Sequence, residues 1–192
     1  MNDSKRIAIL LNPRSMRGVG EDYAPPMGLL MASINLYNKF EMVIIDQRTD
    51  PDWKTKLLNL LKKHPLCLGV TSLTGKQIEG ALLASEMSKA NGCRVVWGGV
   101  HASLLPEQTL AHPCVDYVVA GEGEESFAEL VQAFAANAPS KDIRGVWSKV
   151  GGQAVFGGSR QFVNLDKLPP IPYHLIDLTK YIKRGPYGDS MV

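Results

Sequence analysis

Hydroxyl side chains and a glycine stand together in Thr71-Ser72-Leu73-Thr74-Gly75, at the end of an apolar run. Hydroxyl groups can donate hydrogen bonds to a polar ligand and accept them, without filling the space that the ligand needs. These residues therefore predict a binding loop. A structural role remains open, because Thr and Ser also cap helices and glycine eases a turn.

A second group, Gly98-Gly99-Val100-His101, follows another apolar run. Two adjacent glycines permit backbone angles that other residues avoid, and they let a ligand lie against the main chain. A tight turn is the alternative interpretation. His101 has the chemistry of a metal ligand, a base or a loop contact. No second ligand stands at a recognisable spacing from it, which favours a loop contact over a metal site.

A third group, Gly121-Glu122-Gly123, ends a further apolar run and precedes Glu124 and Glu125. The Glu122 carboxylate could reach a hydroxyl or an amide of a ligand. Glu124 and Glu125 suit the first turn of a helix, where the helix dipole favours negative charge. Glu122 and Glu124 are a weaker candidate for a catalytic acid and base, because no nucleophile lies nearby in the sequence.

A fourth group lies in the loop after the first apolar run and contains Asn12, Arg14, Ser15 and Arg17. Two arginines beside glycines could hold a phosphate. The loop is neither a dinucleotide fingerprint nor a P-loop, because Gly18-Val19-Gly20-Glu21-Asp22-Tyr23 matches neither glycine pattern. A solvated loop without a ligand is the alternative.

Each of these groups follows a short apolar run typical of a buried strand. Five strands are predicted, at Arg6–Leu11, Met42–Asp46, Cys67–Ser72, Arg94–Trp97 and Tyr117–Ala120. Apolar residues at helical spacing predict helices over Met27–Ile34, Trp53–Leu61, Lys76–Ala90 and Phe127–Phe134. This alternation predicts an α/β fold, a flavodoxin-like (Rossmann-like) doubly wound five-stranded parallel sheet of order 2-1-3-4-5. Ligands of such sheets bind at the carboxyl ends of the strands, where the four groups would meet.

The pattern changes after the α/β domain expected over residues 1–140. Residues 141–160 predict a β-hairpin extension that turns at Gly151-Gly152. Residues 161–192 include the proline-rich stretch Leu168–Tyr173 and have no strong periodicity, so they are expected to form a linker.

Composition narrows the class of protein. The net charge of +2 on 192 residues gives no electrostatic footprint for nucleic acid. No run approaches the roughly 20 apolar residues of a membrane helix. Cys67, Cys93 and Cys114 are odd in number and widely spaced, which excludes a disulfide framework and a CxxC metal cluster. We expect a reduced, cytoplasmic protein with neither a nucleic-acid nor a membrane partner.

Five segments, taken in order, resemble a known family. They are Pro25–Leu30, Val43–Asp46, Gly69–Gly75, Val95–Glu107 and Val115–Glu124. Together they look like the N-terminal cobalamin (B12)-binding domain of B12-dependent radical SAM enzymes. The similarity covers about residues 5–182. It includes the hairpin and Asn164–Tyr181, a segment that in this family leads into a radical SAM barrel.

The resemblance implies that cobalamin lies on the carboxyl edge of the sheet. Its nucleotide tail would follow Thr71–Gly75, Gly98–His101 and Gly121–Gly123, and the loop Asn12–Arg17 would approach the corrin face. Methionine-synthase-type domains ligate cobalt through the His of an Asp-x-His-x-x-Gly loop. The corresponding loop here, Asn12–Gly18, has no His. Cobalamin without an axial histidine is therefore expected, and no residue of the chain is expected to be a metal ligand.

The resemblance also implies that this chain is not catalytic by itself. A radical SAM cluster needs a CxxxCxxC run, which the three scattered cysteines do not supply. The iron–sulfur cluster and S-adenosylmethionine are therefore expected in a C-terminal radical SAM barrel, a partner in cis absent from this sequence. The whole enzyme would perform methyl transfer or a radical cyclisation or rearrangement. Two alternatives stay open: a degenerate domain without cofactor that acts as a scaffold or interaction module, and a flavodoxin-like domain that binds another nucleotide-type ligand.

Overall fold

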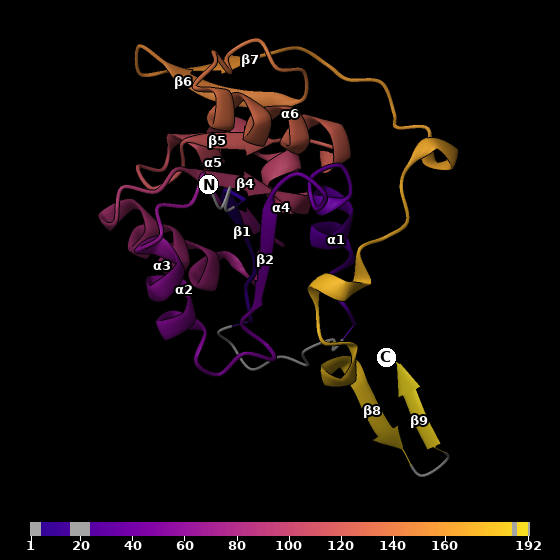
Figure 1. The fold of residues 1–192 in the computed structure, drawn as a ribbon. Coiled ribbons are helices and arrows are strands. Elements are labelled where there is room, and N and C mark those ends of the chain that lie inside the picture. Colours follow the sequence, from indigo (N-terminus) through magenta and orange to yellow (C-terminus); the bar gives the residue numbers. More distant parts are fainter. Residues whose placement is uncertain (1–4, 16–23, 186–187, 192) are drawn as a thin grey trace.

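The strands of the α/β core, β1 to β7, form one twisted sheet with helices on both faces (Figure 1). The computed structural model describes residues 5–15, 24–185 and 188–191. The sheet order is β2-β1-β3-β4-β5-β6-β7, and β1 to β5 run parallel. Their bounds are Ile7–Asn12 (β1), Glu41–Asp46 (β2), Leu68–Thr71 (β3), Val95–Gly98 (β4), Tyr117–Val119 (β5), Val146–Val150 (β6) and Gln153–Phe156 (β7). The predicted α/β class and the order 2-1-3-4-5 are confirmed.

Two layers of helices enclose the sheet. α1 (Met27–Ser33) and α6 (Gly123–Ala136) cover one face. The other face packs against α2, α3, α4 and α5, which span Trp53–Leu61, Ile78–Ala90, Gly99–Leu104 and Pro106–Ala111. The helices α4 and α5 were not predicted from the sequence. Each has only six residues, too few for a helical period to emerge.

The strands are apolar because both of their faces are covered. In β1, Ile9 and Leu11 pack towards α2 and α3, whereas Ala8 and Leu10 pack towards α1 and α6. Trp97 of β4 is almost fully buried, and its indole Nε1 donates a hydrogen bond to Ser85 Oγ of α3 at 2.9 Å. This packing fixes the carboxyl ends of the central strands, where the predicted binding residues lie.

The predicted hairpin over 141–160 extends the same sheet. Its first strand, β6, pairs antiparallel with β5, and β7 pairs antiparallel with β6. The rings of Trp147 and Phe156 stack across this pair, with their centroids 4.8 Å apart. The hairpin therefore covers the edge that β5 would otherwise expose.

The segment predicted as a linker runs along the outside of the α/β core (Figure 1) and packs on it through a few side chains. We call residues 160–181 the strap. Ile171, Leu175 and Ile176 of the strap pack against the α1 and α6 layer. Beyond the strap, β8 (Ile182–Gly185) and β9 (Gly188–Met191) form a separate hairpin. This hairpin was missed because IKRG and GDSM show no apolar alternation. In the described part of the chain, no helix has the length and apolar character needed to cross a bilayer.

Candidate functional site at the carboxyl edge of the sheet

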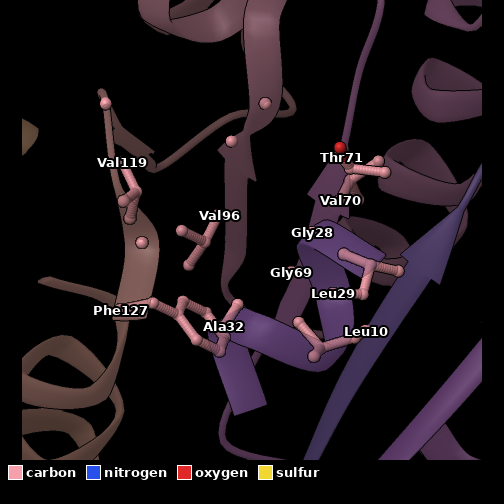
Figure 2. Close-up of a pocket in the computed structure, with 14 residues that line it drawn as sticks. Leu10, Gly28, Leu29, Ala32, Gly69, Val70, Thr71, Val96, Val119 and Phe127 are labelled. Carbon is pink, nitrogen blue, oxygen red and sulfur yellow. The ribbon is translucent and has the colours of Figure 1, made fainter. Parts of the chain in front are cut away.

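A cleft of about 140 Å³ opens between the carboxyl halves of the central strands and the helices α1 and α6. Figure 2 shows side chains from the sheet and from the helices converging on this cleft: Val96 and Val119 lie on strands, and Phe127 lies on α6. The fourteen lining residues are Leu10, Gly28, Leu29, Ala32, Gly69, Val70, Thr71, Val96, Gly98, Gly99, Val119, Gly121, Gly123 and Phe127. All are uncharged, so the cleft is suited to binding and offers no acid or base.

Four glycines leave open space along this cleft. A Cβ atom added at Gly28 or at Gly121 would meet no heavy atom within 4 Å. At Gly98 the nearest atom would be the Val119 carbonyl oxygen, at 3.7 Å, and at Gly123 the nearest contacts would lie at 3.9 Å. Gly121 has a φ of +80°, so the turn after β5 already favours glycine there. At Gly28, Gly98 and Gly123, neither close packing nor a positive φ requires glycine. Their missing side chains leave room for a narrow ligand beside the backbone.

Two further glycines in the lining have structural reasons. A Cβ at Gly69 would lie 2.6 Å from Leu10 Cδ2 and 3.2 Å from the Phe127 ring, so these two side chains occupy the space that a side chain at Gly69 would need. Gly99 has a φ of +84°, and its Cβ would lie 2.6 Å from Thr71 Oγ1. Gly99 therefore serves the tight turn from β4 into α4, the alternative that the sequence left open.

The predicted loop residues after β3 and β4 bind one another. Ser72 is buried, and its backbone N–H donates to the Gly98 carbonyl at 3.1 Å. The His101 backbone N–H donates to the Ser72 carbonyl at 3.1 Å. The His101 ring shares a hydrogen bond between Nδ1 and Thr74 Oγ1 at 3.0 Å, so His101 forms a loop contact. Among the described residues, no three His, Cys, Asp or Glu side chains are grouped as a metal site would require.

Of the predicted residues after β5, Gly121 and Gly123 line the cleft, whereas Glu122 contacts the strap. The Gly121 backbone N–H donates to Ser103 Oγ of α4 at 2.9 Å. The Glu122 carboxylate accepts a hydrogen bond from the Val163 backbone N–H of the strap at 2.7 Å. Glu122 therefore anchors the strap and does not line the cleft. Sequence reasoning missed Ser103, because a single serine in a segment without a predicted element carries no signal.

The loop after β1 is held by glutamines from other elements. Asn12 Oδ1 accepts a hydrogen bond from Gln77 Nε2 at 3.2 Å, and the Arg14 backbone N–H donates to Gln47 Oε1 at 3.1 Å. Within the described residues, the buried Ser15 hydroxyl has no hydrogen-bond partner. None of Asn12, Arg14 and Ser15 lines the cleft. Arg17, which was considered with them as a phosphate contact, lies outside the described residues.

The structure thus brings five predicted residues to the cleft: Thr71, Gly98, Gly99, Gly121 and Gly123. The predicted residues Leu73, Thr74, Gly75 and Val100 are exposed and do not line it.

Other lining residues were missed by sequence reasoning, notably Gly28 and Ala32 of α1 and Gly69 of β3. A signal existed for Gly69, because strand alternation places it on the same face as Thr71. Gly28 stands out as a glycine inside an apolar helix.

None of the three cysteines lines the cleft, and Cys67 and Cys93 are core residues, whereas Cys114 is half-buried. Cys67 is fully buried, and burial raises the pKa of its thiol well above the usual range. Burial also raises the pKa of Cys93 to about 11. Both thiols stay protonated at neutral pH and are poor nucleophiles.

Solved structures share this fold. The radical S-adenosylmethionine methyltransferase TsrM from Kitasatospora setae, with cobalamin and a [4Fe–4S] cluster bound, superposes with a TM-score of 0.68 and 23% identity. The match covers 86% of this chain and 31% of TsrM. The cobalamin-dependent S-adenosylmethionine radical enzyme OxsB, with aqua-cobalamin and S-adenosylmethionine bound, gives a TM-score of 0.65 at 16% identity. That match covers 83% of this chain and 23% of OxsB.

Comparison of the sequence finds one curated relative and one family model. "Uncharacterized methyltransferase PH0819" from Pyrococcus horikoshii is 30% identical over 193 residues, which cover 97% of this chain. The chain spans only 42% of the length of that relative. The family model described as "B12 binding domain" matches residues 14–131. This match includes thirteen of the fourteen lining residues, all but Leu10 of β1, and extends over more than half of the sequence, so the chain belongs to the family of B12-binding domains.

Proposed function

We propose that the cleft holds the nucleotide tail of cobalamin, with the corrin ring above the carboxyl edge of the sheet. The observation that carries the proposal is the open space beside Gly28, Gly98 and Gly123, where neither a positive φ nor close packing requires glycine. A sheet that packs only against its own helices has no need of three such missing side chains in one cleft. The proposal rests also on membership of the B12-binding family.

The lining suits this group chemically. The base of the nucleotide tail is flat and aromatic, and the apolar side chains of Val96, Val119 and Phe127 would contact it. The Thr71 hydroxyl and the glycine backbone would serve the polar atoms of the tail. Bound cobalamin would supply a cobalt centre that can carry a methyl group. The residues of this chain would orient the cofactor and keep its tail out of water.

The first test is a titration of the purified chain with hydroxocobalamin, followed by gel filtration to measure the retained fraction. We expect stoichiometric retention. A Gly28→Leu variant should retain roughly tenfold less, because its side chain enters the cleft. The same change should raise the free energy of unfolding by about 0.5 kcal/mol, since leucine favours a helix over glycine.

Lower cobalamin retention together with a higher free energy of unfolding would distinguish a blocked cleft from a damaged fold. Absence of any retained cobalamin on the unmodified chain would contradict the proposal and favour a cofactor-free interaction domain. Undiminished retention by Gly28→Leu would show that the ligand lies elsewhere on the molecule.

We further propose that cobalt receives no histidine ligand from this chain. The described part of the β1 loop contains no histidine, and His101 is engaged with Thr74. A His101→Ala variant should therefore leave the visible absorption spectrum of bound hydroxocobalamin unchanged. The measurement compares difference spectra of the two proteins at equal occupancy. A shifted spectrum would assign His101 to the cobalt.

For the whole protein, we propose methyl transfer by a radical SAM enzyme of which this region is the cofactor-binding part. A radical SAM barrel in cis would be its partner and would hold the iron–sulfur cluster and S-adenosylmethionine. This is supported by the name of the Pyrococcus horikoshii relative and by the fold shared with TsrM and OxsB. The uncharged cleft agrees with a binding role, since it offers no group for proton transfer.

A further inference from the structure

The strap is tied to the α/β core at its first residue. Arg160 forms ion pairs with two carboxylates of α6, to Glu125 Oε2 at 2.8 Å and to Glu129 Oε2 at 2.6 Å. Its Nε also donates to Ser126 Oγ at 3.1 Å. Both glutamates are about half exposed, so these pairs contribute modestly and serve mainly to fix where the strap begins.

The other end of the strap is held by a buried carboxylate. Asp46, the last residue of β2, is only 2% exposed. Tyr181 is also 2% exposed, and its hydroxyl donates a hydrogen bond to Asp46 Oδ2 at 3.0 Å. Arg48 Nη2 lies 2.7 Å from the same oxygen. Burial and the neighbouring carboxylate raise the pKa of Tyr181, so its hydroxyl remains a donor at neutral pH. We call Asp46, Arg48 and Tyr181 the Asp46 node.

The Asp46 node also holds the approach to α1. Arg48 Nη2 donates to the Ala24 carbonyl at 2.8 Å, three residues before α1 begins at Met27. The helix α1 has seven residues and no side-chain cap at its N-terminus, so its placement depends on packing and on how the chain enters it. Gly28 and Ala32 of this helix form one wall of the cleft.

Between its two ends, the strap packs on the same layer as α1. Ile171, Leu175 and Ile176 contact the apolar cluster that contains Leu29 and Leu30 of α1. The His174 ring meets the Tyr37 ring edge-on, with centroids 5.3 Å apart. The strap and the helical wall therefore share one apolar surface and one buried anchor.

We propose that the Asp46 node positions the α1 wall of the cleft and couples it to the strap, so that loosening the strap opens the cleft. Tyr181, Asp46 and Arg48 are positioning residues, because none of them lines the cleft. The proposal that this movement controls a ligand rests on the proposed function. The coupling between strap and α1 does not, and can be measured without a ligand.

The test compares Tyr181→Phe with Tyr173→Phe in the ligand-free chain. Among the described residues, the Tyr173 hydroxyl contacts only Met27 Sδ, a weak acceptor, at 3.9 Å. Tyr173→Phe therefore controls for the loss of a tyrosine hydroxyl on the strap without loss of a hydrogen bond to a buried carboxylate. Hydrogen exchange of backbone amides should be about tenfold faster in Tyr181→Phe over residues 27–36 and 177–181, because one buried hydrogen bond to a charged acceptor is lost. Exchange in β3 and β4 should not change. Asp46→Asn should act in the same direction, and Tyr173→Phe should resemble the unmodified chain.

Unchanged exchange over residues 27–36 in Tyr181→Phe would overturn the coupling, as would an equal acceleration throughout the chain. With cobalamin, the dissociation rate from Tyr181→Phe should rise by a similar factor. An unchanged rate in a variant whose α1 exchanges faster would overturn the link to the cleft. Failure of the unmodified chain to bind cobalamin would contradict the proposed function alone, since the exchange result would stand.

Discussion

A Gly98→Leu variant should retain roughly ten- to a hundredfold less cobalamin than the unmodified chain while unfolding at the same temperature. Gly98 has extended backbone angles, with φ −142° and ψ −168°, which leucine adopts without strain. Strand alternation puts its side chain on the face of Val96, above the cleft. Filling an occupied site typically costs about 1–3 kcal/mol, which corresponds to the stated loss.

The measurement pairs the fraction of hydroxocobalamin retained after gel filtration with thermal unfolding followed by circular dichroism. Two controls bracket the result. Gly98→Ala adds only a Cβ, for which there is room, so its loss should be smaller. Gln153→Leu places the same leucine at an exposed strand position of β7 and should retain cobalamin fully. Equal retention by Gly98→Leu and Gln153→Leu would contradict the assignment of the cleft.

A Gly99→Ala variant should instead lower the free energy of unfolding by about 2–5 kcal/mol. The backbone φ of +84° costs a residue with a Cβ roughly 1–2 kcal/mol. The added atom would also lie 2.6 Å from Thr71 Oγ1 and 2.9 Å from the Ser72 nitrogen, and overpacking of this kind costs about 1–3 kcal/mol. Urea unfolding with an unchanged slope would measure the difference.

Gly75→Ala is the matched control for this prediction. Gly75 has a similar φ of +77°, but its Cβ would meet nothing within 4 Å. Only the backbone cost applies there, roughly 1–2 kcal/mol. Equal destabilisation by the two variants would mean that the Thr71 hydroxyl moves aside and that the close approach of β3 to Gly99 carries no cost.

Much of the fold could be predicted because its strands are continuous apolar runs. Runs such as Arg6–Leu11 can only be buried on both faces, which requires helices between parallel strands. The order 2-1-3-4-5 was predicted as that of a flavodoxin-like sheet, one of the common orders that right-handed crossovers allow. The same reasoning placed Thr71, Gly98 and Gly121 at one edge, where the structure has them.

Short or irregular elements could not be predicted in this way. The helices α4 and α5 are too short to show a period, and β8 and β9 lack apolar alternation. The strap was expected to be a linker because its apolar residues follow no period. Three of them, Ile171, Leu175 and Ile176, nevertheless pack on the core, since a segment without regular structure can present side chains to the core at any spacing.

The sequence by itself determined the parallel sheet, its carboxyl edge and the presence of small residues there, because those depend on local period and composition. It could not say what each small residue does. Gly98 and Gly99 are adjacent and chemically identical, yet one leaves a space in the cleft and the other fills a tight turn. Only the tertiary structure separates them, because the difference lies in a backbone angle and in how closely Thr71 of the neighbouring strand approaches. The Asp46 node likewise joins residues 135 positions apart, a contact that no local pattern encodes.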